Sequence, residues 1–263
     1  MNNTLIKGLH LLETLARRGQ AMGVSELAVA AGLPKSGAHR LLQALVGEGY
    51  VLRQEAGSYS TSIKLWELGS AALSGFDLRR HADGIMEALV QATGETVHLS
   101  VLDRYEVVYV HKIDSANPVR AYTQIGGRAA AHCVATGKAM MAFKTAGWLA
   151  GAMEQLHTAT PNTITDPDAF LAEMQKIRRN GYAINRGEWR LSVNGLAAPI
   201  LDGTGAVIAA IGISGPESRL RPARLRVLAA QVAEAAQTLS ASLGEAAPHA
   251  SLLSVTNHWG ALQ

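Results

Sequence analysis

Glycines divide the first 61 residues into three short segments with helical periodicity, and two β-like runs follow them. The first segment ends at Gly19. Its apolar residues recur at helical spacing and are Leu5, Leu9, Leu12, Leu15 and Ala16. A second helix is expected from Val24 or Ser25 to Gly32, with the Ser25 hydroxyl as N-cap. A third is expected from Pro34 to about Glu48. Runs at 50–53 and 58–61 join through Gly57, a hairpin signal. This order predicts a winged helix-turn-helix.

The rest of the chain changes to a mixed pattern. We expect helices at 63–77 and 78–93, strands at 95–102, 106–113 and 119–125, and a loop at 126–135. Helices follow at 136–143, 148–156 and 166–180, then strands at 196–201 and 206–214, and a last helix at 221–243. This order predicts an α+β domain with a mostly antiparallel sheet flanked by helices. The tail after Gly244 has weak periodicity and is expected to be mobile.

The charge of the chain is unevenly distributed. The whole chain has 24 basic and 21 acidic residues, a net charge of +3. Residues 1–80 hold nine basic and six acidic side chains, so the entire excess lies in the first third. Such an asymmetry suggests an anionic partner for that end, although three charges could also arise by chance.

Other features narrow the class of protein. One cysteine permits no intrachain disulfide, and no apolar run approaches the roughly twenty residues of a membrane span. The N-terminus lacks a secretory signal, so a cytoplasmic protein is expected. His132 and Cys133 are adjacent, which is not the geometry of a catalytic dyad. The stretch at 135–138 resembles a phosphate-binding loop only faintly, because His132 and Ala139 stand where that motif needs Gly and Ser or Thr. We therefore expect no enzyme, no metal and no cofactor.

Several segments in order resemble the IclR-type family of bacterial transcriptional regulators. They are VSELAVAAGLPKSGAHRLLQALVGEGYV, TGETVHLSVLD, HCVATGKA, PNTITDP, RRNGYAINRGE, LAAPI and AIGISGP. The resemblance covers almost the whole chain. It implies a winged helix-turn-helix at 1–62, a linker helix at 63–77 and a GAF-like effector-binding domain at 78–244, before a tail at 245–263. Such regulators are dimers or tetramers that bind operators near catabolic genes and respond to organic acids or aromatic metabolites. Repression and activation both stay open.

The candidate DNA-binding residues cluster at the start of the third helix. Lys35, Ser36, His39 and Arg40 lie where a recognition helix meets base edges. Ser25 at the second helix could help to hold a phosphate, and Arg53 and Tyr59 on the wing could reach the DNA backbone. The alternative for each residue is the solvated face of a small helical domain. The linker helix, with Trp66 and Leu73, is the expected association surface, unless it packs onto its own domain.

The resemblance also implies an effector pocket. It is lined by Ala129, Ala135, Thr136, Asn185, Val193, Gly195, Gly212 and Ser214, with the amides of Ala135 and Thr136 available to a carboxylate. Small-acid binders of the family tend to have an acidic residue, a cysteine and a serine where this chain has Asn185, Gly195 and Gly212. We therefore expect a larger and more apolar effector, with aromatic acids as candidates and Trp189 available for stacking. The alternative for the two glycines is strand packing. A GAF-like domain with undetected enzymatic activity on a small metabolite is the alternative function.

Overall fold

The computed structural model describes residues 3–55, 57–73 and 78–245. The chain divides into two compact units, Met1–Phe76 and Asp77–Gln263. Each unit has its own core, and each is described by itself. The expected mobile tail at 245–263 lies outside the described residues apart from Glu245.

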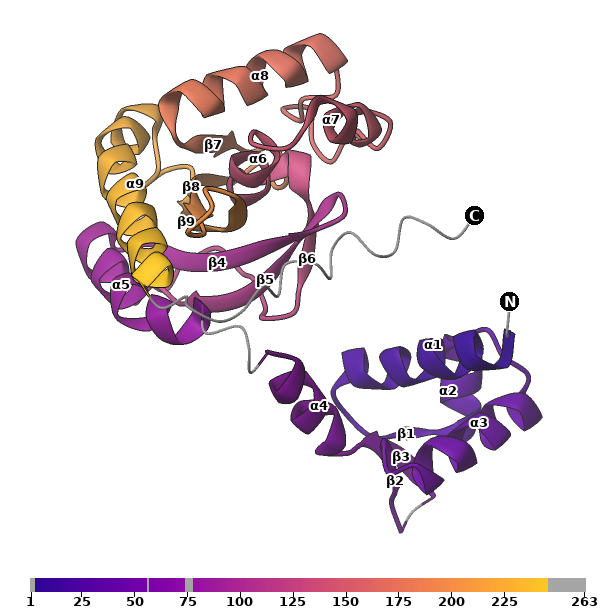
Figure 1. Ribbon diagram of the computed structural model, residues 1–263. Helices are drawn as coiled ribbons and strands as arrows, with labels where there is room; N and C mark the ends of the chain where they lie inside the picture. The colour runs from indigo at the N-terminus through magenta and orange to yellow at the C-terminus, as the bar shows by residue number, and fades with distance from the viewer. Residues whose placement is uncertain (1–2, 56, 74–77, 246–263) are drawn as a thin grey trace. The chain divides into compact units, whose positions relative to one another are not determined.

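The N-terminal unit is a small helical domain with a three-stranded sheet (Figure 1). Its elements are α1 (Asn3–Arg18), β1 (Met22–Gly23), α2 (Val24–Ala30), α3 (Lys35–Gly47), β2 (Val51–Arg53), β3 (Ser58–Thr61) and α4 (Lys64–Leu73). The apolar faces of the first three helices meet in one core, with Leu11, Leu15, Leu27 and Leu42 fully buried. The strands β2 and β3 form the antiparallel wing, and Gly57 at its turn has a φ of 79°. The winged helix-turn-helix is therefore present.

Three local details of this unit differ from the sequence expectation. Helix α2 begins at Val24 with Gly23 as N-cap, so Ser25 lies exposed in the first turn and is not the cap. The two-residue strand β1 was not expected; it pairs with β3 and places that strand in the centre of the sheet order β1-β3-β2. Helix α4 ends at Leu73, and residues 74–77 of the expected linker lie outside the described residues, as does the side chain of Leu73.

The C-terminal unit is built on a six-stranded sheet in the order β6-β5-β4-β9-β8-β7, with every neighbouring pair antiparallel. The strands are β4 (Thr96–Asp103), β5 (Glu106–Ile113), β6 (Arg128–Ala130), β7 (Ala183–Arg186), β8 (Val193–Leu201) and β9 (Val207–Pro216). Helices α5 (Leu78–Thr93) and α9 (Pro222–Glu245) cover one face. Helices α6 (Ala135–Met141), α7 (Ala146–Met153) and α8 (Pro167–Asn180) lie on the other side of the sheet (Figure 1). The unit is therefore a three-layer α+β domain.

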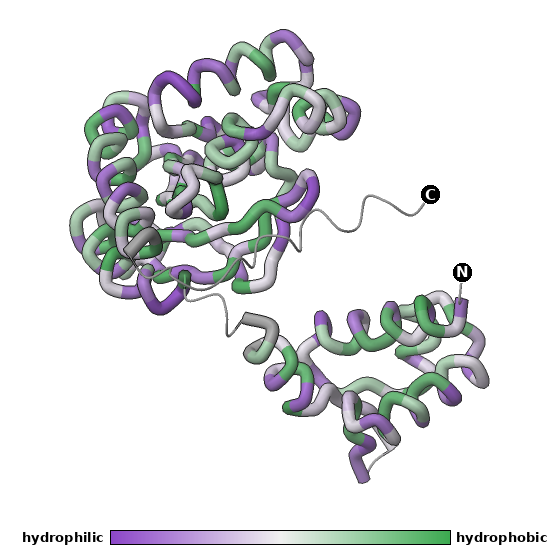
Figure 2. Tube along the Cα trace, viewed as in Figure 1, coloured by the Kyte–Doolittle hydropathy of each residue, from purple (hydrophilic) through white to green (hydrophobic). Residues whose placement is uncertain are grey.

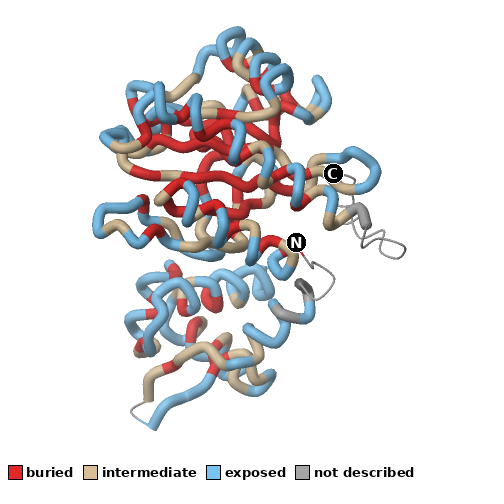
Figure 3. The backbone as a smooth tube through the Cα atoms, turned by 90° about the vertical axis from the view of Figure 1, so that its left-hand side faces the viewer, coloured by how far each residue is buried: buried red, intermediate tan, exposed pale blue. Residues whose placement is uncertain are grey.

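The alternation of side chains along the strands explains this layering. In β8, Leu196 and Ile200 are fully buried on one face, while Gly195 and Ala197 face the α6 side. Because both faces are covered, β8 and β9 are hydrophobic almost throughout, whereas β4 alternates apolar residues with Thr96, His98 and Ser100; Figure 2 colours the chain by hydropathy. Figure 3 shows the same strands as the most deeply buried layer of this unit.

Three parts of this unit differ from the sequence expectation. The strand expected at 119–125 is absent, and residues 114–127 form neither helix nor strand. Side chains hold this segment in place of a strand ladder: the Lys112 Nζ donates to the Thr123 carbonyl at 2.8 Å, and Arg219 donates to the Val119 carbonyl at 2.8 Å. The loop expected at 126–135 instead contains the short strand β6 and a 3₁₀ turn, and β7 was not expected. None of the described helices is long and apolar enough to cross a membrane.

Candidate ligand pocket and DNA-binding surface

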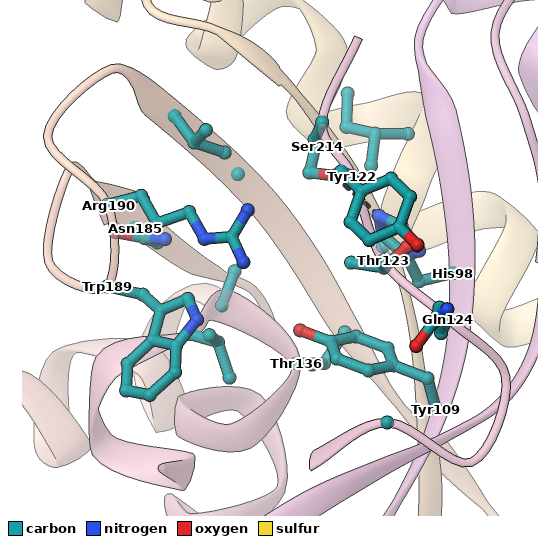
Figure 4. Close-up of a pocket in the computed structure, with 18 of the residues that line it drawn as sticks. His98, Tyr109, Tyr122, Thr123, Gln124, Thr136, Asn185, Trp189, Arg190 and Ser214 are labelled. Carbon is teal, nitrogen blue, oxygen red and sulfur yellow. Dashed lines mark hydrogen bonds between the residues drawn. The ribbon is translucent and has the colours of Figure 1, made fainter. Parts of the chain in front are cut away.

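A cavity of about 220 Å³ opens on the α6 side of the sheet (Figure 4). Its walls come from β4, β8 and β9, from the first turn of α6, from the turn between β7 and β8, and from the segment at 121–124. Such a cavity exceeds the roughly 150 Å³ that accommodates a benzene ring in a protein core. Its size therefore suits a molecule of one ring with small substituents.

The structure brings eight of the nine expected effector residues to this cavity. Those lining it are Ala135, Thr136, Asn185, Trp189, Val193, Gly195, Gly212 and Ser214. The expectation for Ala129 is wrong, because this residue is buried in the apolar core between the sheet and the helices α6–α8. Neighbouring residues of a strand point to opposite faces, and it is Arg128 that lines the cavity.

Sequence reasoning missed half of the cavity. The residues it did not name include His98, Tyr109, Tyr122, Thr123, Gln124, Arg128 and Arg190. Most of them come from β4, β5 and the irregular segment 114–127, which carried no ligand-binding motif. Arg190 stands directly after Trp189, so its charge could have been noticed in the sequence.

One side of the cavity is polar but uncharged. His98 is buried, with Nε2 hydrogen-bonded to the Ser214 hydroxyl at 2.5 Å and Nδ1 to the Thr123 hydroxyl at 3.2 Å. Burial, and to a smaller extent the nearby Lys112 charge, lower the pKa of His98 to about 4. His98 is therefore neutral at pH 7. Its ring lies against Tyr109 at 5.3 Å between centroids, and burial raises the pKa of that phenol to about 12.

The opposite side carries a positive charge. Figure 4 shows the guanidinium of Arg190 directed into the cavity beside the Trp189 ring. Arg190 is close enough to Tyr109 for its charge to lower the pKa of that phenol, against the effect of burial. The other lining arginine, Arg128, is already paired with Asp103 and with Glu106, the latter at 2.7 Å from Nε to Oε2. No ion pair of Arg190 is found among the described residues, and no acidic residue lines the cavity. The cavity is therefore suited to an anion.

Thr136 adds an unused hydrogen-bonding group. Its side chain is 95% buried in the first turn of α6, and its Oγ1 has no hydrogen-bond partner within the part of the chain that the structure describes. A buried polar atom without a partner costs roughly 1–3 kcal/mol. Because Thr136 lines the cavity, a bound polar group could remove this cost.

The two lining glycines differ in the space around them. A Cβ on Gly195 would lie 3.6 Å from the Ala135 Cβ and 3.2 Å from the Ile213 carbonyl oxygen, so it nearly fits. A Cβ on Gly212 would lie 2.6 Å from both the Ala197 Cβ and the Leu196 carbonyl oxygen. Strand packing therefore explains Gly212, whereas a Cβ at Gly195 would meet its neighbours at close to ordinary contact distances.

The residues expected at the start of the recognition helix form one exposed surface. Lys35, Ser36, His39 and Arg40 line a shallow depression with Val24 at the N-terminal end of α3. Ser25 is exposed in α2, and Arg53 is exposed at the end of β2. The expectation for Tyr59 is wrong: it is 2% exposed at the centre of the small sheet, with its hydroxyl near the Gln43 amide at 3.4 Å. It belongs to the core of this unit and cannot reach a phosphate.

The structure gives no support to the catalytic alternative at Cys133. The thiol is buried, and burial raises its pKa to about 12, which opposes thiolate formation. His132 instead hydrogen-bonds the His157 carbonyl at 3.0 Å. Within the described ranges, no group of three His, Cys, Asp or Glu side chains is placed to hold a metal ion.

A winged helix-turn-helix with a basic helix end, joined in one chain to a second domain with a cavity, defines the class of two-domain DNA-binding regulators. Comparison with known proteins gives the family. The model of the bacterial transcriptional regulator IclR C-terminal domain matches residues 70–241, and that of the IclR helix-turn-helix domain matches residues 4–55. The chain belongs to the IclR family of bacterial transcriptional regulators.

Individual relatives agree with this assignment. The chain is 34% identical over 245 residues to the HTH-type transcriptional regulator KdgR of Escherichia coli K12, covering 92% of this chain and 93% of the relative. It is 31% identical over 246 residues to the transcriptional repressor IclR of the same organism, covering 92% and 90%. These relatives are named as regulators and not as enzymes.

Two solved structures resemble the whole chain. One is an IclR homolog from Microbacterium hydrocarbonoxydans complexed with 4-hydroxybenzoate, with a TM-score of 0.83 and 27% identity, covering 93% of this chain and 100% of that one. The other is the Thermotoga maritima IclR, with a TM-score of 0.76 and 30% identity at the same coverage.

Proposed function

We propose that this DNA-binding regulator changes its operator affinity when a small aromatic carboxylate occupies the cavity of the C-terminal unit. The observation that carries the proposal is the Arg190 guanidinium, directed into a cavity with no acidic lining residue. A carboxylate would pair with Arg190, and hydrogen bonds that involve a charged group contribute roughly 1.5–3 kcal/mol each.

The apolar lining and the size of the cavity favour a ring over a two- or three-carbon acid. Trp189 offers a half-buried indole face beside Arg190, and the small residues Ala135 and Gly195 line the same cavity. The structurally similar homolog complexed with 4-hydroxybenzoate supports a ligand of this class for the present chain.

A ligand screen tests the effector proposal. Benzoate and 4-hydroxybenzoate should raise the melting temperature of the protein, whereas glyoxylate and pyruvate should not. Arg190→Gln should weaken binding of the aromatic acid by tenfold or more in calorimetric titration. Arg179→Gln is a matched control, because Arg179 is an exposed arginine of α8 that does not line the cavity. Stabilisation by a two- or three-carbon acid and by no aromatic acid would contradict the proposal.

For the DNA-binding unit, we propose that Lys35, Ser36, His39 and Arg40 contact operator bases and phosphates. This proposal is supported by the common surface that the four residues form at the start of α3. Arg40→Ala should weaken binding about tenfold or more to a duplex selected from a random-sequence pool, because one good arginine–base contact contributes about 1–3 kcal/mol. Gel-shift titration measures this, with Arg179→Ala as the control. Wild-type affinity of a folded Arg40→Ala protein would refute the assignment.

Ser25 and Arg53 are proposed to contact the phosphate backbone on either side of the recognition helix. Both are exposed, and Arg53 has no ion pair among the described residues. A contact to the phosphate backbone does not distinguish one base sequence from another. Substituting Ser25 or Arg53 should therefore lower the affinity for all duplexes alike.

We also propose a homo-oligomer that associates through the linker helix. Ile63 and Trp66 are each 68% exposed, and Leu68 is 46% exposed, which leaves a large apolar surface at α4. A two-fold assembly would match a pseudo-palindromic operator. Light scattering of Trp66→Ser against wild type tests this, and an unchanged molar mass at micromolar concentration would count against the linker helix as the interface.

A further inference from the structure

A buried ion pair lies directly behind the cavity. Lys138 in α6 is 1% exposed, and its Nζ lies 2.7 Å from Oε1 of Glu188, which is 5% exposed. Its second carboxylate neighbour is Glu173 of α8, at 3.4 Å. Replacing a buried ion pair with apolar residues is often neutral or stabilising, so stability alone does not explain this pair.

The pair connects two walls of the cavity. Lys138 stands two residues after Thr136, in the helix whose first turn lines the cavity; we call Ala135 and Thr136 the helix wall. Glu188 directly precedes Trp189 and Arg190, which we call the turn wall. The ion pair therefore links the segment that carries one wall to the segment that carries the other.

Apart from the packing of Trp189 against the apolar core, the turn that carries Glu188 is held mainly by hydrogen bonds to its backbone. The hydroxyls of Thr160 and Thr163 donate to the carbonyls of Gly187 and Glu188 at 2.6 and 2.7 Å. The Glu188 amide donates to Asn185 Oδ1 at 2.8 Å. These bonds shape the turn, and they attach it to the 160–163 segment and to β7. Trp189 also packs against the apolar cluster to which α6 contributes, but the Glu188 carboxylate makes the one ion pair recorded between this turn and α6 among the described residues.

We propose that Lys138 and Glu188 are positioning residues that set the separation between the helix wall and the turn wall, and so determine which planar ligands the cavity accepts. The Glu188 Oε1 also accepts from the Arg186 amide at 3.2 Å. The carboxylate therefore holds both the conformation of the turn and its distance from α6. The ligand part of this inference rests on the proposed function; the positioning part does not.

The test compares two substitutions on the two carboxylate partners of one lysine. Glu188→Gln keeps an acceptor for the Arg186 amide but removes the ionic link to the turn wall. Glu173→Gln removes the same charge from the partner in α8, which carries no wall of the cavity. Both proteins lose one carboxylate next to Lys138, so a purely electrostatic role of the pair predicts similar effects.

The first readout needs no ligand. In a background of Trp66→Phe, Trp148→Phe and Trp259→Phe, Trp189 is the only tryptophan of the chain, and acrylamide quenching of its selectively excited fluorescence reports its exposure. We expect Glu188→Gln to raise the quenching constant about twofold and Glu173→Gln to leave it unchanged. Equal effects of both substitutions, or no effect of Glu188→Gln, would overturn the positioning role. If Glu188→Gln does not fold, Lys138→Met/Glu188→Gln, which removes both charges, takes its place under the same criteria.

The second readout is the affinity for benzoate. It should fall about tenfold in Glu188→Gln and stay within about twofold of wild type in Glu173→Gln. Unchanged affinity in Glu188→Gln would overturn the role of the pair in ligand choice. If the unmodified protein binds neither benzoate nor 4-hydroxybenzoate, the proposed function fails, and the quenching measurement still decides the positioning role.

Discussion

Gly212→Ala tests whether strand packing requires the glycine in β9. The added Cβ would stand 2.6 Å from the Ala197 Cβ and 2.6 Å from the Leu196 carbonyl oxygen. Both atoms belong to the neighbouring strand β8, which pairs with β9 along its whole length, so neither can move without shifting the backbone. The substitution should therefore strain the centre of the sheet.

The expected loss is moderate. Overpacking a closely packed core costs typically 1–3 kcal/mol, and alanine recovers about 0.5–1 kcal/mol because it is less flexible than glycine in the unfolded chain. The net loss is about 1–2 kcal/mol. For a domain of this size, 1 kcal/mol corresponds to about 2–4 °C in melting temperature, so the midpoint should fall by about 2–8 °C.

Scanning calorimetry measures the melting temperature of the C-terminal unit in Gly212→Ala, with Gly195→Ala as the matched control. There the Cβ would meet the Ile213 carbonyl oxygen at 3.2 Å and the Ala135 Cβ at 3.6 Å, so the stability should change by less than about 1 kcal/mol. Adding Ala197→Gly to Gly212→Ala should restore part of the loss, because the clash with Leu196 persists. Equal midpoints for the two alanine variants would refute the packing argument.

Three further outcomes follow from the structure. The folded protein lowers the pKa of His98 to about 4, so the contribution of the neutral His98 to the free energy of unfolding is fully present above about pH 6.5. This contribution should fall by up to about 3 kcal/mol as the pH is lowered toward 4. Urea titrations should show that this part of the pH dependence disappears in His98→Gln. Gly195→Val should place a larger side chain at the cavity lining and reduce binding of an aromatic acid by calorimetry more than it reduces thermal stability. Tyr59→Phe should leave operator affinity in gel shifts unchanged, since its buried ring cannot contact DNA, and a tenfold loss would contradict this placement.

Elements with a clear hydrophobic period could be predicted from the sequence. The helices α1, α3, α5, α8 and α9 and the strands β4, β5 and β9 lie close to their expected ranges. At α8 the local signals were complete: Asp166 caps the helix by accepting from the Ala169 amide, Pro167 opens it, and Gly181 ends it with a φ of 76°. The expected domain boundaries, by contrast, stay predictions.

Short elements and non-local assembly explain the errors. The two-residue strand β1 is too short to show any alternation, and without it Tyr59 was placed on an exposed wing and not in a central strand. The run at 119–125 has strand-forming residues, yet Val119 and Tyr122 are exposed and no neighbouring strand pairs with it. His98 and Thr123 meet Ser214 only because β4 and β9 are neighbours in the sheet, which no local pattern reports.

The irregular segment at 114–127 has a consequence for how new ligand preferences could arise. Gly126 and Gly127 at its end exchange backbone hydrogen bonds with Tyr109 of β5, but residues 121–124, which line the cavity, have no backbone–backbone hydrogen bond to any strand that the structure describes. Changes of sequence or length there would leave the hydrogen-bonded register of all six strands untouched. A biosensor engineer could therefore randomise residues 121–124 while keeping Lys112 and Arg219, which hold the segment through its backbone carbonyls. Most members of such a library should fold and differ in the small molecules that they detect.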